Sequence, residues 1–117
     1  MFENYNELMS SIAEALYESV NEDWHSITIS VERGIESIQI DGYFLDINNE
    51  EKEPDLMSIF MKTRNLFREL YQTMTVETDK HKWNRAKATL TDEMKLNMEF
   101  EWDQELADEL ERLSKKV

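Results

Sequence analysis

Residues 95–102 alternate between polar and apolar side chains, and this pattern constrains the fold more than any other feature of the chain. The apolar positions are Leu96, Met98, Phe100 and Trp102, and the polar positions are Lys95, Asn97, Glu99 and Glu101. Successive side chains of a β-strand point to opposite faces, so the pattern predicts a strand with one buried face. A sheet built from such strands has an apolar face that other elements must cover.

Three further segments alternate in a similar way and predict three more strands. Arg33-Gly34 marks a tight turn between the first two segments, and Asp92-Glu93 separates the third from residues 95–102. Each neighbouring pair therefore predicts a β-hairpin. Gly42 stands in an apolar row, where a glycine indicates a bulge or a close contact. The three segments are residues 24–32, 35–45 and 83–91.

Apolar residues recur at helical spacing in the remaining segments, which predicts helices over residues 4–20, 55–74 and 103–116. In the second helix, Phe60 belongs to the predicted apolar stripe. Asp103 is a candidate N-cap of the last helix. The order α-β-β-α-β-β-α predicts an α+β fold with a four-stranded antiparallel sheet from two hairpins, packed by helices. We expect a single domain over residues 1–117.

The net charge of −13 indicates the class of partner, because so acidic a chain repels nucleic acid and anionic membranes and attracts basic surfaces. The charge is −12 over residues 1–59, +4 over residues 60–91 and −5 over residues 92–117. The chain has no cysteine and no apolar run of transmembrane length, and Glu3 is acidic where a signal peptide is basic. These features favour a cytoplasmic protein without a membrane partner.

The sequence contains no catalytic constellation, so we expect no enzymatic activity, no metal and no cofactor. With two glycines there is no glycine-rich phosphate loop, and His25 and His81 have no motif partner. The acids at 99, 101 and 103 could bind a cation, but a solvated acidic strand face is the favoured interpretation. Arg85 and Lys87 are expected to form cross-strand charge pairs with those acids instead of binding single-stranded nucleic acid.

The order of aromatic motifs resembles the YezG-like antitoxin family, which includes immunity proteins of polymorphic toxins. The motifs run over most of the chain, about residues 5–112, but Asp92-Glu93-Met94 replaces a glycine turn that is usual in the family. The segments that carry the resemblance are Ile59-Phe60-x-x-x-Arg64-x-x-Phe67, Trp83-Asn84-Arg85-Ala86-x-x-Thr89-Leu90 and Met98-Glu99-Phe100-Glu101-Trp102-Asp103. The resemblance implies a cytoplasmic antitoxin that binds a secreted toxin domain, often a nuclease.

The charge distribution and the resemblance together predict a cognate toxin domain as the partner, bound through acidic side chains. The predicted partner-binding residues are Asp41, Asp46, Glu50, Glu51, Glu53, Asp55, Glu99, Glu101 and Asp103. The alternative is a general protein-binding adaptor or regulatory subunit that uses exposed methionine and aromatic side chains, with Met57, Met61 and Met94 as candidates. A third possibility is a metal-dependent hydrolase that uses Glu99, Glu101 and Asp103.

Overall fold

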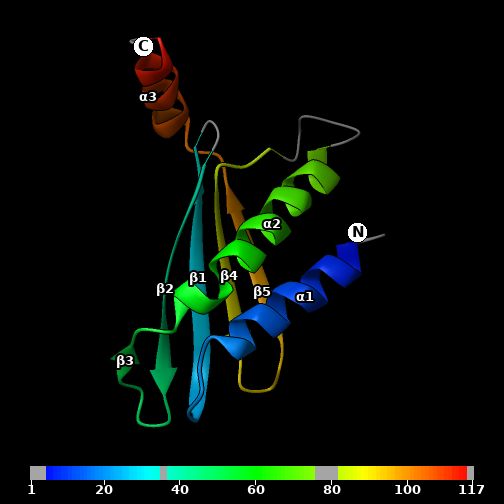
Figure 1. Cartoon of the computed structure of the whole chain (residues 1–117), viewed down its shortest axis with the longest axis vertical. Coiled ribbons are helices and arrows are strands. Elements are labelled where there is room, and N and C mark those ends of the chain that lie inside the picture. The colour runs from blue at the N-terminus through cyan, green and yellow to red at the C-terminus, as the bar shows by residue number, and fades with distance from the viewer. Residues whose placement is uncertain (1–4, 35–36, 76–81, 116–117) are drawn as a thin grey trace.

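The computed structural model describes residues 5–34, 37–75 and 82–115 and confirms the predicted α+β class (Figure 1). Its elements are α1 (Tyr5–Glu18), β1 (Trp24–Arg33), β2 (Ile38–Asp46), β3 (Glu51–Lys52), α2 (Leu56–Thr75), β4 (Arg85–Thr91), β5 (Leu96–Glu101) and α3 (Gln104–Ser114). The order follows the prediction, with the short strand β3 added in the acidic loop before α2.

The sheet is antiparallel and has five strands in the order β3-β2-β1-β4-β5, where four were predicted. The two predicted hairpins lie side by side because β1 pairs with β4, with Ser30 opposite Lys87. The extra strand β3 has only two residues, which pair with Phe44 and Leu45 of β2. A strand this short contains no alternation of polar and apolar residues, so the sequence pattern could not predict it.

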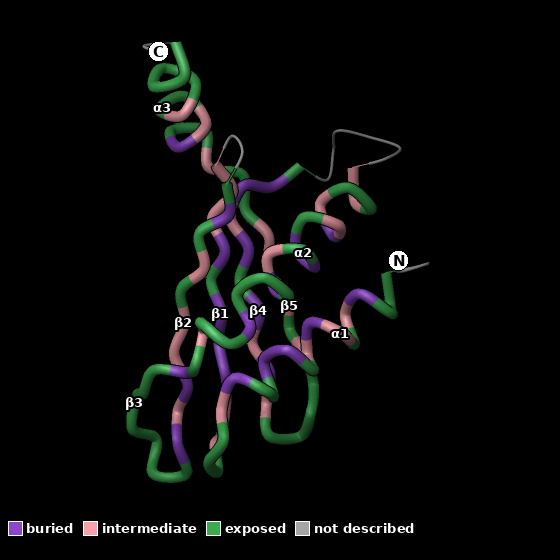
Figure 2. The backbone as a smooth tube through the Cα atoms, in the orientation of Figure 1, coloured by how far each residue is buried: buried purple, intermediate pink, exposed green. Residues whose placement is uncertain are grey.

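Helices α1 and α2 cover one face of the sheet, and the buried residues lie between them and the strands (Figures 1 and 2). Ile27, Ile29 and Val31 supply the central row of this core from β1. Trp83, two residues before β4, is fully buried, and its ring makes an edge contact with Phe67 at 6.3 Å between centroids. The prediction that helices cover the apolar face is therefore confirmed for α1 and α2.

Gly42 makes the close contact that its place in the apolar row predicted. A Cβ atom at this position would lie 2.6 Å from the backbone oxygen of Thr28, which is closer than real Cβ atoms approach. The pairing register of β1 and β2 runs continuously through Gly42, so the glycine serves a close approach of two backbones and not a bulge.

Helix α3 extends beyond the end of the sheet instead of lying over its apolar face (Figure 1). Asp103 is its N-cap, as predicted, and accepts a hydrogen bond from the Leu106 N–H at 3.1 Å. The buried side chain of Asn84 fixes the same junction: its Nδ2 donates to the Asp103 backbone oxygen at 2.8 Å, and its Oδ1 accepts from the Asp103 N–H at 2.7 Å. The predicted apolar stripe of α3 consists of Leu106, Leu110 and Leu113. Only Leu106 of this stripe is buried, and Leu113 is 49% exposed.

Candidate partner-binding face

No described helix covers the second face of the sheet, which we call the open face. Every second residue of the four long strands points to this side. On β1 these residues include Thr28, and on the other strands they are the residues that pair with them across the sheet. They are Ser26, Thr28, Ser30 and Glu32 of β1, Gln39, Asp41, Tyr43 and Leu45 of β2, Arg85, Lys87, Thr89 and Thr91 of β4, and Asn97, Glu99 and Glu101 of β5. The open face is polar, with its charged residues at the end where β1 finishes and β2 begins.

The strand order brings the two predicted acidic segments onto this one face. Asp41 of β2 and Glu99 of β5 lie in the same cross-strand row, with Ser30 and Lys87 between them. Glu51 of β3 is paired with Leu45 and so adds a carboxylate on the same side. Asp41, Glu51 and Glu99 are all exposed, and side chains far apart in the sequence thus share one surface.

Arg85 connects two strands of the open face, β4 and β1, to the start of α3. Its Nη1 lies 3.1 Å from Glu32 Oε2, and its Nε donates to Asp103 Oδ2 at 3.0 Å. The hydrogen bond that Arg85 donates to Asp103 raises the pKa of Arg85, while the Leu106 N–H and then the Arg85 guanidinium lower the pKa of Asp103. Glu101 is directly opposite Arg85, as the predicted cross-strand pair requires, but the ion pairs of Arg85 go to Glu32 and Asp103.

Lys87 lies directly opposite Glu99, and both side chains are exposed. The pair has the predicted cross-strand position, although no ion pair joins the two groups within the described part of the chain. Around this end of the sheet lies a hollow of about 820 Å³, which is lined by Asp41, Lys87 and Glu99 among others. The charged end of the open face therefore borders an accessible hollow, which also reaches Ile40 and Phe60 on the helical side.

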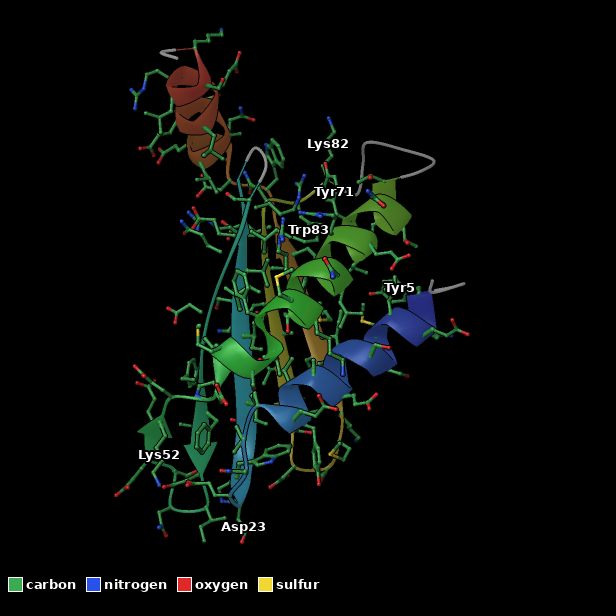
Figure 3. All side chains as sticks on the ribbon, viewed as in Figure 1. Tyr5, Asp23, Lys52, Tyr71, Lys82 and Trp83 are labelled. Atoms are coloured by element: carbon green, nitrogen blue, oxygen red, sulfur yellow. The ribbon has the colours of Figure 1, made fainter. Side chains whose placement is uncertain are left out.

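Asp46 serves the chain internally, because its carboxylate closes the turn between β2 and β3. It is 4% exposed, and Oδ1 accepts hydrogen bonds from the N–H groups of Asn48 and Glu50. Its Oδ2 lies 3.0 Å from Nζ of Lys52, which Figure 3 shows on β3. The Glu50 N–H and Lys52 together lower the pKa of Asp46. Of the predicted partner-binding residues, Asp46 presents the least surface to another protein.

The other acids of the 46–55 loop differ in how far they are engaged. Asp55 caps α2 by accepting a hydrogen bond from the Ser58 N–H at 3.2 Å, and its own N–H donates to the Ser19 oxygen at 2.8 Å. Glu50 and Glu53 are exposed. The loop therefore contributes Glu50, Glu51 and Glu53 as accessible carboxylates, at the opposite end of the sheet from Arg85 (Figure 1).

Two features of this surface were not selected from the sequence. Glu32 was not predicted as a site residue, although it continues the polar row of β1. The pairing of β1 with β4 places it opposite Arg85. Phe60 was predicted to be in the apolar stripe of α2, but it is 38% exposed and contributes to the hollow, so that prediction is wrong. The neighbouring Met57 and Met61 are 88% and 59% exposed, as the adaptor interpretation expects.

The described ranges contain no group of three or more histidine, aspartate or glutamate residues placed to hold a metal ion. Within the same ranges, no helix combines the length and the apolar character that crossing a membrane requires. No protein-family model matches the sequence, and no curated protein matches it significantly.

Proposed function

We propose that this chain is a non-catalytic, cytoplasmic immunity protein of the YezG-like antitoxin family, which binds a basic toxin domain, a nuclease, and blocks it. The observation that carries the proposal is the charge of the open face. Six carboxylates lie on it or at its border, against two basic side chains. The carboxylates are Glu32, Asp41, Glu51, Glu99, Glu101 and Asp103, and the basic side chains are Arg85 and Lys87.

Electrostatics links this face to the proposed partner. A nuclease binds phosphates through basic side chains, so its substrate groove attracts an acidic surface and is filled by it. Arg85 is already neutralised by Glu32 and Asp103, which leaves Asp41, Glu51, Glu99 and Glu101 as exposed acids for a partner. Inhibition then requires occupancy of the groove or of a surface beside it, and no chemical step by this chain.

The motifs behind the family assignment have structural roles in this fold. Trp83 is in the core, and Asn84 holds the junction between β5 and α3. Residues of this kind define a fold and leave the exposed face free to vary with the partner. The motifs therefore support family membership, and the choice of toxin rests with the acidic surface.

We expect the adjacent upstream gene to encode the toxin domain, and this domain provides the direct test. We expect this domain to stop growth when expressed alone and to be tolerated when the chain is co-expressed. The double variant Glu51→Gln/Glu99→Gln should slow association at low salt by about tenfold, because it removes one carboxylate from each acidic segment. Surface plasmon resonance at low and high ionic strength measures this rate.

The matched control is Glu14→Gln/Glu69→Gln, which removes the same charge from the helical side of the molecule. Its association rate should stay within about twofold of the wild type, since its charges lie away from the open face. An upstream domain that neither stops growth nor binds would overturn the immunity proposal. An association rate equal for both double variants, or indifferent to salt, would overturn the electrostatic part.

A second candidate function, a protein-binding adaptor, is favoured by the exposed apolar side chains of Met57, Phe60 and Met61 on α2. Methionine side chains adapt to varied partners because they are flexible and polarisable. The triple variant Glu50→Gln/Glu51→Gln/Glu53→Gln separates the two functions. Adaptor binding would be insensitive to it, whereas binding of a basic toxin would weaken.

A further inference from the structure

The outer edge of β2 lacks a partner strand along most of its length. β2 spans Ile38–Asp46, and β3 pairs only with Phe44 and Leu45. From Ile38 to Tyr43, no strand of the described chain lies on the side away from β1 (Figure 1). An unpaired edge of this kind is a template for another strand.

The hydrogen-bond pattern shows which backbone groups face this empty edge. The Asp46 N–H donates to the Glu50 oxygen, on the side of β3, and backbone groups alternate in direction along an antiparallel strand. The groups of Gly42, Ile40 and Ile38 therefore point outward as well. The Gly42 N–H agrees with this direction, because it donates to the Asp41 carboxylate at 2.8 Å instead of to β1. Ile38 and Ile40 thus present their N–H and C=O groups to an added strand.

Three of the usual devices that protect a sheet edge are missing here. Residues 38–43 contain no lysine and no proline, and β2 pairs with β1 without a bulge in this segment. The other edge strand, β5, carries two charged residues, Glu99 and Glu101, whereas Ile38–Tyr43 of β2 carries one, Asp41. The β2 edge is therefore the more accessible of the two for pairing with another chain.

The two sides of the β2 edge differ in chemistry. Ile38 and Ile40 point to the helical side, where α2 contributes the partly exposed Phe60. Gln39 and Asp41 point to the open face, beside Glu32 and Ser30 of β1. An added strand would thus meet apolar side chains on one side and uncompensated acid on the other.

We infer that the β2 edge at Ile38–Tyr43 receives an extended segment of the partner protein, which adds to the sheet as a sixth strand with alternating apolar and basic side chains. Main-chain hydrogen bonds to Ile38 and Ile40 give affinity. Apolar side chains of the segment pack toward Phe60, and its basic side chains face Asp41. The inference rests on the proposed function in that the segment belongs to the bound toxin domain.

Proline substitution tests the edge without disturbing the sheet. Ile40→Pro removes an N–H that points outward, so no hydrogen bond to β1 is lost. Met98→Pro is the matched control, since the backbone of Met98 also points outward, on β5, and both side chains pack partly against the core. Circular dichroism verifies that both variants are folded. If Ile40→Pro does not fold, Gln39→Lys replaces it as the test variant, because it adds a positive charge beside Asp41.

With the upstream toxin domain, we expect Ile40→Pro to weaken binding by at least tenfold, about the effect of losing one or two hydrogen bonds and their packing. Met98→Pro should bind as the wild type does. Equal binding by wild type and Ile40→Pro would overturn the inference while leaving the immunity function intact. Loss of binding with Met98→Pro alone would also overturn it, because the partner would then use β5.

A peptide probe tests whether the β2 edge accepts a strand, even if the toxin domain does not bind. A short synthetic peptide of alternating lysine and valine should shift the amide resonances of Ile38 and Ile40 and slow their exchange. The lysine peptide should not give this response with Ile40→Pro, and a peptide of alternating glutamate and valine should not give it with the wild type. No response of the wild type to the lysine peptide, or a dimer of the chain that Ile40→Pro dissociates, would overturn the partner segment as the occupant.

Discussion

The carboxylate of Asp46 closes the turn between β2 and β3 while most acids of the loop remain exposed. Its two oxygens contact two backbone N–H groups and Lys52, and this set of contacts also involves Glu22, which lies 2.9 Å from Lys52 Nζ. Charge and loop position selected Asp46 as a partner-facing residue, and the same properties suit a carboxylate that accepts hydrogen bonds from its own turn. Composition cannot separate these two uses, because only the path of the backbone decides which donors are within reach.

The lowered pKa of Asp46 predicts a specific dependence of stability on pH. In the folded chain the pKa lies below its ordinary value of 3.8, so the contribution of Asp46 is present above that value and is lost as pH falls through the folded pKa. We therefore expect Asp46→Ala to be less stable than the wild type at pH 7, with a difference that shrinks below about pH 4. Urea denaturation followed by circular dichroism measures it.

Asp46→Asn is the control for this prediction. The asparagine oxygen can still accept from Asn48 and Glu50, but the attraction to Lys52 is lost, so its stability at pH 7 should lie between those of the other two proteins. A stability difference between wild type and Asp46→Ala that stays constant from neutral pH to pH 3 would contradict the role given to the ionised carboxylate.

Helix α3 shows where periodicity stops being informative about an element. The sequence predicted its range, its stripe and its Asp103 cap, and all three describe the helix alone. Whether the stripe is covered depends on the direction in which the chain leaves β5, and that direction is set by the hydrogen bonds between Asn84 and Asp103. The same limit applies to β3, whose two residues pair only because the loop folds back along β2.

The contacts of Asn84 predict that it controls both the stability and the motion of α3. Asn84→Ala leaves the Asp103 N–H without its partner and leaves the Asp103 C=O with only the helical hydrogen bond from the Ala107 N–H, which should cost about 1–3 kcal/mol of unfolding free energy. Amide hydrogen exchange in α3 should become faster, whereas exchange in α2 should change less. Denaturant titration and exchange measured by NMR provide the two readouts.

Asn97→Ala is the matched control, an asparagine of the adjacent strand β5 that is exposed on the open face. Its effect on stability should stay within about 0.5 kcal/mol. If the two alanine variants lose similar stability, or if α3 exchanges unchanged in Asn84→Ala, the junction is held by other contacts.

In the whole molecule, α1 and α2 occupy one side of the sheet, and charge is concentrated on the other. Single segments predicted the strands and the acids, but the gathering of Asp41, Glu51 and Glu99 on one face required the order β3-β2-β1-β4-β5. Two hairpins can join through different edges, and each segment alone has no preference for one of them. The acidic residues of the candidate site could thus be selected from the sequence, whereas their arrangement and the free β2 edge could not.

The net charge of −13 predicts that salt stabilises the folded chain. Repulsion among the excess carboxylates opposes the compact state and is screened by salt, so Tm should rise by a few degrees between about 0.05 and 0.5 M sodium chloride. Glu14→Gln/Glu69→Gln changes the net charge from −13 to −11 without removing an ion pair within the described residues, so its Tm should rise less with salt. A falling Tm would mean that screening of ion pairs such as Arg85–Glu32 dominates.

The three tryptophans lie in three different environments, and this gives the molecule its own set of optical probes. Trp83 is enclosed by Phe67, Tyr71 and Phe100 in the core, whereas Trp102, at 44% exposure, precedes the α3 cap. Trp24 begins β1 against the ring of Tyr17, at the end of the sheet nearest the acidic loop. Emission from each indole, isolated by replacing the other two with phenylalanine, would report separately on the core, on the α3 junction and on the loop end of the sheet. The progress of binding or unfolding could then be followed at each place without an attached label.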